Sequence, residues 1–269
     1  MTSVGLVARV IPPGLYAGRS RALVERSVLV NRRMWLTIVS GFFEPLFYLL
    51  AFQVGFGKLV QTVAGPGGMQ MSYVAFVAPG LLASSAMNGA VYDATFNVFF
   101  KFKYAKLYDA MLATPLGPVD VAVGEVSWAL LRGGMYAVAF IIVMLGMGLI
   151  GSVWALLLLP AALLVAFAFA AIGMAATTFL RSVTDFDLIL LAVIPMFLLS
   201  TTFYPLSVYP RPLQIVVECF PLYHGVELMR GLTTGVVGFS MLGHVAYFVV
   251  MAAVGVWAAS RRLARLLLR

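Results

Sequence analysis

The segment Phe203–Gly235, FYPLSVYPRPLQIVVECFPLYHGVELMRGLTTG, decides how this chain is organised. It is too apolar for an ordinary solvated loop. It is also too broken for one membrane-spanning helix, because each proline removes a backbone donor and clashes with a continuing helix. The breaks are at Pro205, Pro210, Pro212 and Pro221. The segment therefore predicts short helices that lie at a membrane surface, or that enter the bilayer where protein covers their backbone.

Two short amphipathic helices are expected between these prolines. The first has an apolar face made of Leu213, Val216, Val217 and Phe220, opposite Arg211, Gln214 and Glu218. The second has an apolar face made of Leu222, Val226 and Met229, opposite His224, Glu227 and Arg230. We expect these helices to form an outer gate, hinged at the prolines and anchored by the three polar residues of the second helix.

The composition identifies an integral membrane protein. The 269 residues are 62% hydrophobic and 10% charged, with a mean hydropathy of +1.01. A soluble domain carries about a quarter charged residues. The single cysteine, Cys219, excludes an internal disulfide and a multi-cysteine metal site. The net charge of +8 does not indicate nucleic-acid binding, because the basic residues flank apolar stretches rather than gather on a soluble domain.

The expected fold class is an all-α membrane domain over residues 34–260. Each apolar stretch reaches the roughly 20 residues that cross about 30 Å of hydrocarbon. The six predicted spans are at about 34–57, 72–98, 121–149, 153–180, 184–204 and 238–260. An even number of spans places both termini on one side of the membrane.

The basic residues indicate which side that is. Fourteen of the 18 Lys and Arg residues fall on the side of the termini. The positive-inside rule then predicts cytoplasmic termini. The N-terminal segment 1–33, the loop 99–120 and the basic tail 261–269 face the cytoplasm, whereas 205–237 is extracellular or re-entrant.

Two cytoplasmic segments are candidates for contact with another protein. Residues 15–33 predict an amphipathic helix in the headgroup plane, with Arg19, Arg26 and Arg33 on one face. The alternative is a basic pre-anchor that only fixes topology. In the loop 99–120, Tyr104, Tyr108 and Met111 share one side of a predicted helix, with Lys103 and Lys106 off it. This strip is either a docking surface or a face that rests on lipid.

Charged residues inside spans are costly and therefore informative. Glu44, Asp93, Glu125 and Arg132 are such residues. One interpretation is structural pairing of Arg132 with Glu125 or Glu44. The other is that Glu44 faces a polar substrate cavity.

Aromatic residues are dense in the first predicted span and close the fifth. Most of them are expected to pack or to face lipid. The others would line a route for an amphipathic substrate. The predicted substrate path consists of Glu44, Phe47, Tyr48, Phe52, Phe203 and Tyr204.

Motifs for energy coupling and catalysis are missing from the sequence. No G-x-x-x-x-G-K-[ST] loop is present, and the nearest string, Gly55–Leu59, lacks its spacing and hydroxyl. If transport is ATP-driven, ATP and Mg are bound by a separate chain, and this chain needs no cofactor. Two alternatives are a stand-alone secondary carrier or channel, and a lipid-processing enzyme. The enzyme would have to use His224, Glu227 and Arg230, the only polar cluster available for catalysis.

Three blocks carry a family resemblance: Glu44–Gly57, Tyr73–Arg132 with LYDAMLATPLGPVDVAVGEVSW, and Phe203–Gly235. With these blocks the chain resembles permeases of the type-2 ABC exporter family, in the branch of nodulation protein J and daunorubicin-resistance permeases. Glu44 departs from the family pattern, in which a neutral polar residue usually precedes the proline.

The resemblance implies a homodimer, or a pair with a related permease, that works with two copies of an ABC ATPase in a bacterial cytoplasmic membrane. It implies that spans one, two and five line the substrate path. It further implies export of lipid-linked glycans, lipo-oligosaccharides or amphipathic drugs. The N-terminal helix and the loop 99–120 would contact the ATPase, which makes the expected coupling residues Arg19, Arg26, Tyr104, Lys106, Tyr108 and Met111.

Overall fold

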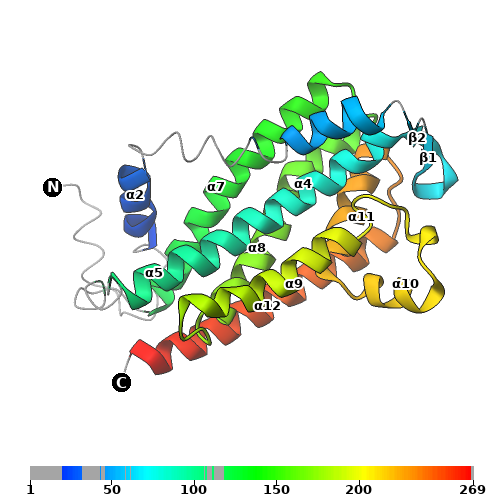
Figure 1. Ribbon diagram of the computed structural model, residues 1–269. Coiled ribbons are helices and arrows are strands. Elements are labelled where there is room, and N and C mark those ends of the chain that lie inside the picture. The colour runs from blue at the N-terminus through cyan, green and yellow to red at the C-terminus, as the bar shows by residue number, and fades with distance from the viewer. Residues whose placement is uncertain are drawn as a thin grey trace.

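A computed structural model describes residues 20–31, 43, 46–57, 59–60, 62–105, 107, 111 and 118–267. These residues are mostly helical, and helices α4, α7, α8 and α12 run side by side as a bundle (Figure 1). Within the described ranges, four stretches are long and apolar enough to cross a membrane: Tyr73–Lys103, Val123–Gly146, Val153–Thr177 and Ser240–Arg262. The prediction of an all-α integral membrane protein is therefore confirmed.

The bundle helices have irregular turns at several ends. The elements are α4 (Tyr73–Tyr92), a π-helical turn (Asp93–Asn97), α5 (Val98–Lys103), α7 (Pro118–Gly146), a 3-10 turn (Val153–Leu157), α8 (Leu158–Thr177) and α12 (Ser240–Leu267). The π-helical turn joins α4 to α5 without a break. Turns of this kind inside α-helices are frequent at functional sites.

The other elements surround this bundle. They are α2 (Ser20–Asn31), an apolar helix (Leu46–Phe56) that ends in a π-helical turn (Phe52–Phe56), strands β1 (Thr62–Ala64) and β2 (Gln70–Ser72) with a 3-10 turn (Pro66–Gly68) between them, a 3-10 turn (Val183–Asp185), α9 (Phe186–Leu199), a 3-10 turn (Leu206–Val208), α10 (Arg211–Glu218) and α11 (Pro221–Thr234). The two strands pair antiparallel, with Val63 opposite Met71. This small hairpin is an addition to the helical fold that the sequence predicts.

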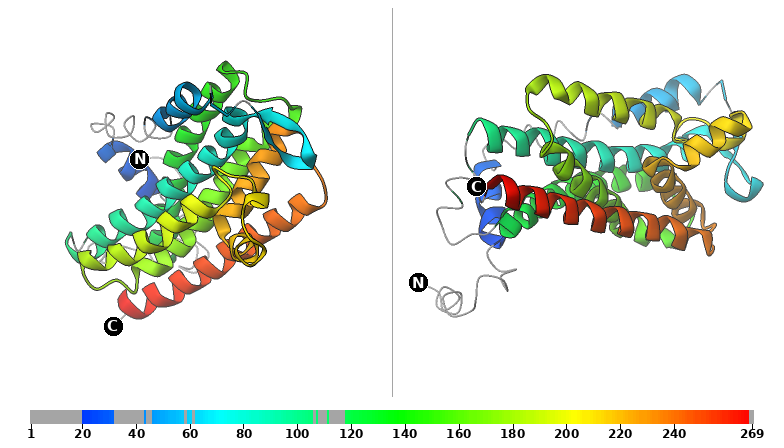
Figure 2. Two further views of the ribbon diagram at one scale, coloured as in Figure 1. Left: turned by 45° about the vertical axis from the view of Figure 1, so that its right-hand side comes forward. Right: turned by 90° about the horizontal axis from the view of Figure 1, so that it is seen from below.

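The elongated bundle has two distinct ends (Figures 1 and 2). One carries the hairpin, α10 and α11, and is called the α11 end. The other carries α2, α5 and the last turns of α12, and is called the α2 end. Helix α2 packs against the first part of α7, where a Cβ added at Gly124 would lie 2.8 Å from the Leu23 side chain.

Small residues bring α8 and α12 close together toward the α2 end. A Cβ added at Gly255 would lie 2.7 Å from the backbone carbonyl carbon of Ala171, so no larger residue fits without moving a helix. Nearer the α11 end, the rings of Phe169 and Phe248 lie 6.3 Å apart. There α11 enters the bundle. A Cβ added at Gly225 would lie 3.5 Å from the side chains of Phe248 and Val165.

Two of the predicted spans are not among the four long apolar helices of the described residues. The first predicted span, 34–57, is described only in part, as the helix Leu46–Phe56. The fifth, 184–204, contains α9, whose 14 residues reach about 21 Å at 1.5 Å per residue. The count of six spans therefore stays a prediction.

Candidate gate and substrate path

The turn that follows α9 is deeply buried, although it is not helical. Ser200, Thr201 and Thr202 have almost no exposed surface. Thr201 has a φ of +60°, which is rare for a β-branched residue. Gly80 of α4 leaves room for this turn, because a Cβ added at Gly80 would lie 3.1 Å from the Cα of Thr202. The turn is therefore held in an unusual conformation by close contact with α4.

Arg230 of α11 fixes this turn. Its side chain is 2% exposed. It donates to the carbonyl oxygens of Phe76 (Nε, 3.3 Å) and Thr201 (Nη2, 2.7 Å) and to Glu227 Oε1 (Nη1, 2.7 Å). One buried cation thus joins α4, α11 and the turn after α9. The sequence places Arg230 on the polar face of its helix, and the structure shows that this face is covered at Arg230.

Two hydroxyl groups of the same turn lack partners. Ser200 Oγ and Thr202 Oγ1 are buried, with no hydrogen-bond partner among the described residues. An unsatisfied buried polar group costs about 1–3 kcal/mol. Strained or unsatisfied groups of this kind cluster at switch regions and active sites, where the surrounding structure maintains them. The turn is thus a candidate moving part.

Aromatic rings gather beside the turn and bring together three of the predicted path residues. Phe52 lies 5.3 Å from Phe203 and 5.9 Å from Tyr73, measured between ring centres. Phe203 also contacts Phe197 of α9 at 5.2 Å, and Tyr48 lies 6.3 Å from Phe197. The Tyr73 hydroxyl donates to the carbonyl of Phe203 at 3.3 Å. These contacts connect the helix Leu46–Phe56, α9 and α4.

Two further residues of the predicted path are exposed. Phe47 is 62% exposed and Tyr204 is 54% exposed, so both face the surroundings of the protein. Glu44 lies outside the described residues. The predicted path residues therefore include an aromatic centre around Phe52 and Phe203 and two exposed rings, those of Phe47 and Tyr204.

The predicted hinges fall at helix starts. Pro205 precedes the turn Leu206–Val208, Pro212 is in the first turn of α10, and Pro221 opens α11. Proline suits the first turn because its missing N–H has no helical partner there. In α10 only Val217 is fully buried, and Val216, expected on the apolar face, is 49% exposed. Helix α10 is thus only loosely packed.

The chain's two histidines meet at the α11 end, a contact that the sequence analysis missed. Nδ1 of His224 on α11 lies 2.8 Å from Nδ1 of His244 on α12, and the Tyr247 ring centre lies 4.1 Å from that of His224. Burial, and then the nearby His244, lower the pKa of His224 to about 4. The only signal in the sequence was that both histidines flank the start of the last span. Among the described residues, no group of three or more His, Cys, Asp or Glu side chains could hold a metal ion.

Buried ion pairs join α4 and α5 to α7 toward the α2 end. Arg132 pairs with Asp93 at 3.1 Å, and Asn97 donates to the same carboxylate at 2.5 Å. Lys101 pairs with Glu125 at 2.6 Å. The suggested pairing of Glu125 with Arg132 is wrong, because each finds its partner on the neighbouring helix rather than along α7.

The predicted coupling residues are only partly described. Tyr104 is 63% exposed and stacks on Phe100 with ring centres 5.2 Å apart, and Arg26 is exposed on α2. Met111 is buried, so the expected exposed strip of Tyr104 with Met111 does not form. Arg19, Lys106 and Tyr108 lie outside the described residues.

An apolar bundle with a buried ionic turn and an aromatic cluster indicates the membrane subunit of a transporter. Residues 19–234 match the family described as ABC-2 type transporter, and this chain belongs to that family. It is therefore the membrane component of an ABC transporter, as the resemblance of the sequence implies.

Curated relatives in the same family are named nodulation protein J. The protein from Rhizobium leguminosarum bv. viciae is 30% identical, over 80% of this chain and 82% of that protein. The one from Rhizobium leguminosarum bv. trifolii is 29% identical, over 84% and 85%. The one from Rhizobium meliloti (strain 1021) is 28% identical, over 80% of each.

Proposed function

We propose that this chain is the permease subunit of an ATP-driven exporter. It moves an amphipathic substrate, a glycolipid, lipo-oligosaccharide, lipid-linked glycan or hydrophobic drug, outward across a bacterial cytoplasmic membrane. A separate ABC ATPase binds the ATP and Mg. Membership of the ABC-2 family supports this proposal. The observation that carries it furthest is the aromatic cluster around Phe52 and Phe203 beside the strained turn.

The cluster suits a substrate that is part sugar and part hydrocarbon. Aromatic faces bury large apolar areas, and tyrosine adds a polar handle. The cluster adjoins an uncovered apolar surface on the helix Leu46–Phe56 and on α9, where Val54, Leu188 and Leu191 are each at least 65% exposed. A second copy of the chain, or a related permease, facing this surface would enclose a path between the two subunits.

The gate is the turn Ser200–Thr202 with the hinged helices α10 and α11. Thr201 has a positive φ, and the hydroxyls of Ser200 and Thr202 have no partner among the described residues. The turn therefore carries a free-energy cost that another conformation could relieve. Arg230 holds the present arrangement through the Thr201 carbonyl. Opening the path would therefore require this hydrogen bond to break. Pro205, Pro212, Pro221, His224 and Glu227 complete the proposed outer gate.

The α2 end is the proposed cytoplasmic face. We propose that both termini lie on this side and that six spans cross the membrane, as the charge pattern predicts. Helix α2 and the loop 99–120 are the proposed contacts for the ATPase. Among the predicted coupling residues that the structure describes, Arg26 and Tyr104 are exposed and can make this contact. Arg19, Lys106 and Tyr108 complete the proposed surface.

Co-reconstitution tests this proposal. The purified chain and its ATPase are placed in liposomes with a fluorescent glycolipid. Transport should need ATP, and Tyr104→Glu should reduce both ATPase binding and transport severalfold. Met69→Glu is the matched control, since Met69 is 43% exposed in the hairpin at the opposite end and lies outside the proposed gate. Transport driven by an ion gradient without the ATPase would instead support the stand-alone carrier.

A further inference from the structure

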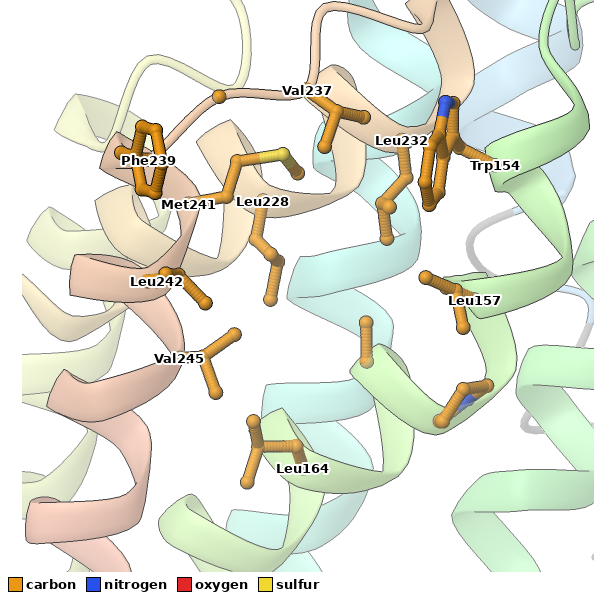
Figure 3. Close-up of a pocket in the computed structure, with 13 residues that line it drawn as sticks. Trp154, Leu157, Leu164, Leu228, Leu232, Val237, Phe239, Met241, Leu242 and Val245 are labelled. Atoms are coloured by element: carbon orange, nitrogen blue, oxygen red, sulfur yellow. The ribbon is translucent and has the colours of Figure 1, made fainter.

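A cavity lies between α8, α11 and α12 at the α11 end, on a different part of the bundle from the aromatic cluster. Its volume is about 580 Å³. Figure 3 shows Trp154 and Leu232 on one side, Leu242 and Val245 on the other, and Leu164 at the base. Every lining residue is apolar or glycine, so the cavity offers no charged or hydroxyl side chain to a ligand.

The cavity follows from how the two long helices pack. At Gly255 the backbones of α8 and α12 pack closely, because a Cβ added there would lie only 2.7 Å from the carbonyl carbon of Ala171. Toward the α11 end, α11 lies between them, and Leu228 and Leu232 of α11 line the space that opens. The space is therefore fixed by the fold rather than left by one small side chain.

The position of the cavity places it within the hydrocarbon region. Its walls are the first turns of two stretches that can cross a membrane, Val153–Thr177 and Ser240–Arg262. From Leu157 to Leu164 the helix rises about 10 Å, which is most of one leaflet of a bilayer whose core is about 30 Å thick. Trp154, 47% exposed, lies near the mouth, as tryptophan does at membrane interfaces.

We infer that this cavity binds one acyl chain of a bilayer phospholipid from the leaflet at the α11 end. Its apolar lining matches a hydrocarbon chain. The volume argues against a helix of a second protein, because two turns of a helix 10 Å wide occupy roughly 850 Å³. The exposed rim residues Phe239, Leu242 and Leu157 leave the cavity open to lipid.

Photolabelling in nanodiscs tests this inference. The full chain is reconstituted in phosphatidylcholine that contains a few percent of a phospholipid with a diazirine in its acyl chain, and labelled peptides are mapped by mass spectrometry. Label should concentrate on residues 157–164 and 241–245. Val245→Trp should fill the space and lower labelling there at least fivefold. Val250→Trp should leave it unchanged, because Val250 is 61% exposed and lines no part of the cavity.

Other outcomes would overturn the inference. Equal labelling along the exposed face of α12 would mean general lipid contact only. Crosslinks between two copies through residues 241–245 would assign the cavity to a subunit interface. Displacement of the phospholipid label by trace amounts of a glycolipid would assign it to the substrate. If Val245→Trp does not fold, Leu242→Trp provides the same test, because Leu242 is at the rim and 63% exposed.

Discussion

The guanidinium carbon of Arg230 lies 3.8 Å from the centre of the Phe76 ring, and the same side chain donates to the Phe76 carbonyl. Both the ring face and the carbonyl stabilise a cation. With the hydrogen bond to Thr201, this buried charge ties α4 to the turn after α9. The contact between Arg230 and Phe76 is thus the point at which the proposed gate is fastened to the bundle.

Replacing Arg230 should loosen the gate. Arg230→Met removes the donors to Phe76, Thr201 and Glu227, and leaving a buried carbonyl acceptor without its donor costs about 1–3 kcal/mol. Arg230→Lys should lie between wild type and Arg230→Met, because an ammonium group lacks the planar fork. The measurement is thermal unfolding of the detergent-purified chain. Arg211→Met is the control, because Arg211 is exposed and, within the described part of the chain, its side chain hydrogen-bonds only to Gln214. Equal melting temperatures for the Arg230 and Arg211 variants would contradict the anchoring role.

The burial of Arg230 shows what the sequence could not predict. Only three positions separate it from Glu227, so helix spacing alone can bring that pair together. Its other partners are 154 and 29 residues distant along the chain, so no local pattern could show that its helix face is covered. Similarly, the contact between His224 and His244 depends on how α11 meets α12. The breaks at Pro210, Pro212 and Pro221 were predictable, because proline acts on its own helix.

The closest approach of α8 to α12 gives a second prediction. Gly255→Ala should destabilise the chain by roughly 1–3 kcal/mol, because its Cβ would meet backbone atoms of Ala171 and Ile172 that cannot rotate away. Gly243→Ala is the matched control on the same helix, since nothing lies within 4 Å of its added Cβ. That control should be neutral or stabilising by at most about 1 kcal/mol. Chemical denaturation in mixed micelles measures both, and a Gly255→Ala variant as stable as wild type would exclude this packing.

Hydropathy predicts the fold class but not the close packing at Gly255. The long apolar stretches are recognisable because a membrane requires length and apolarity. Which glycine faces a neighbouring backbone depends on the crossing of α8 and α12, and Gly243 and Gly255 look alike in the sequence. Likewise α9 is apolar enough for a span, but it ends early because Ser200–Thr202 turn into the core.

The pair formed by Asp93 and Arg132 gives a third prediction. Either single alanine variant leaves one buried charge without its partner and should cost about 3–5 kcal/mol. The double variant should recover part of this loss, with a coupling energy of about 0.5–3 kcal/mol. The pair Lys101 and Glu125 is the control cycle, where smaller coupling is expected because Lys101 is 26% exposed. Strictly additive effects for Asp93 and Arg132 would show that the pair contributes nothing to stability.

The environment of His224 leads to a prediction about pH. His244 and Tyr247 of α12 face it, Glu218 lies just before α11, and Glu227 follows one turn later on α11. Burial and then His244 lower the pKa of His224 to about 4 from the ordinary 6.5, and they outweigh a hydrogen bond with the backbone of Glu218, which raises this pKa. The folded state therefore disfavours the protonated form of His224.

Stability should consequently fall as the pH drops through the interval between these two values. Above pH 6.5 the imidazole is neutral in both the folded and the unfolded chain, so its titration does not lower the free energy of unfolding. Between pH 6.5 and about 4 the unfolded chain binds a proton that the folded chain rejects, and below about 4 the loss is complete. His224→Gln removes the titrating group, so its melting temperature should decline less between pH 7.5 and 4.5 than that of wild type. Parallel declines in the two proteins would show that His224 does not carry the effect.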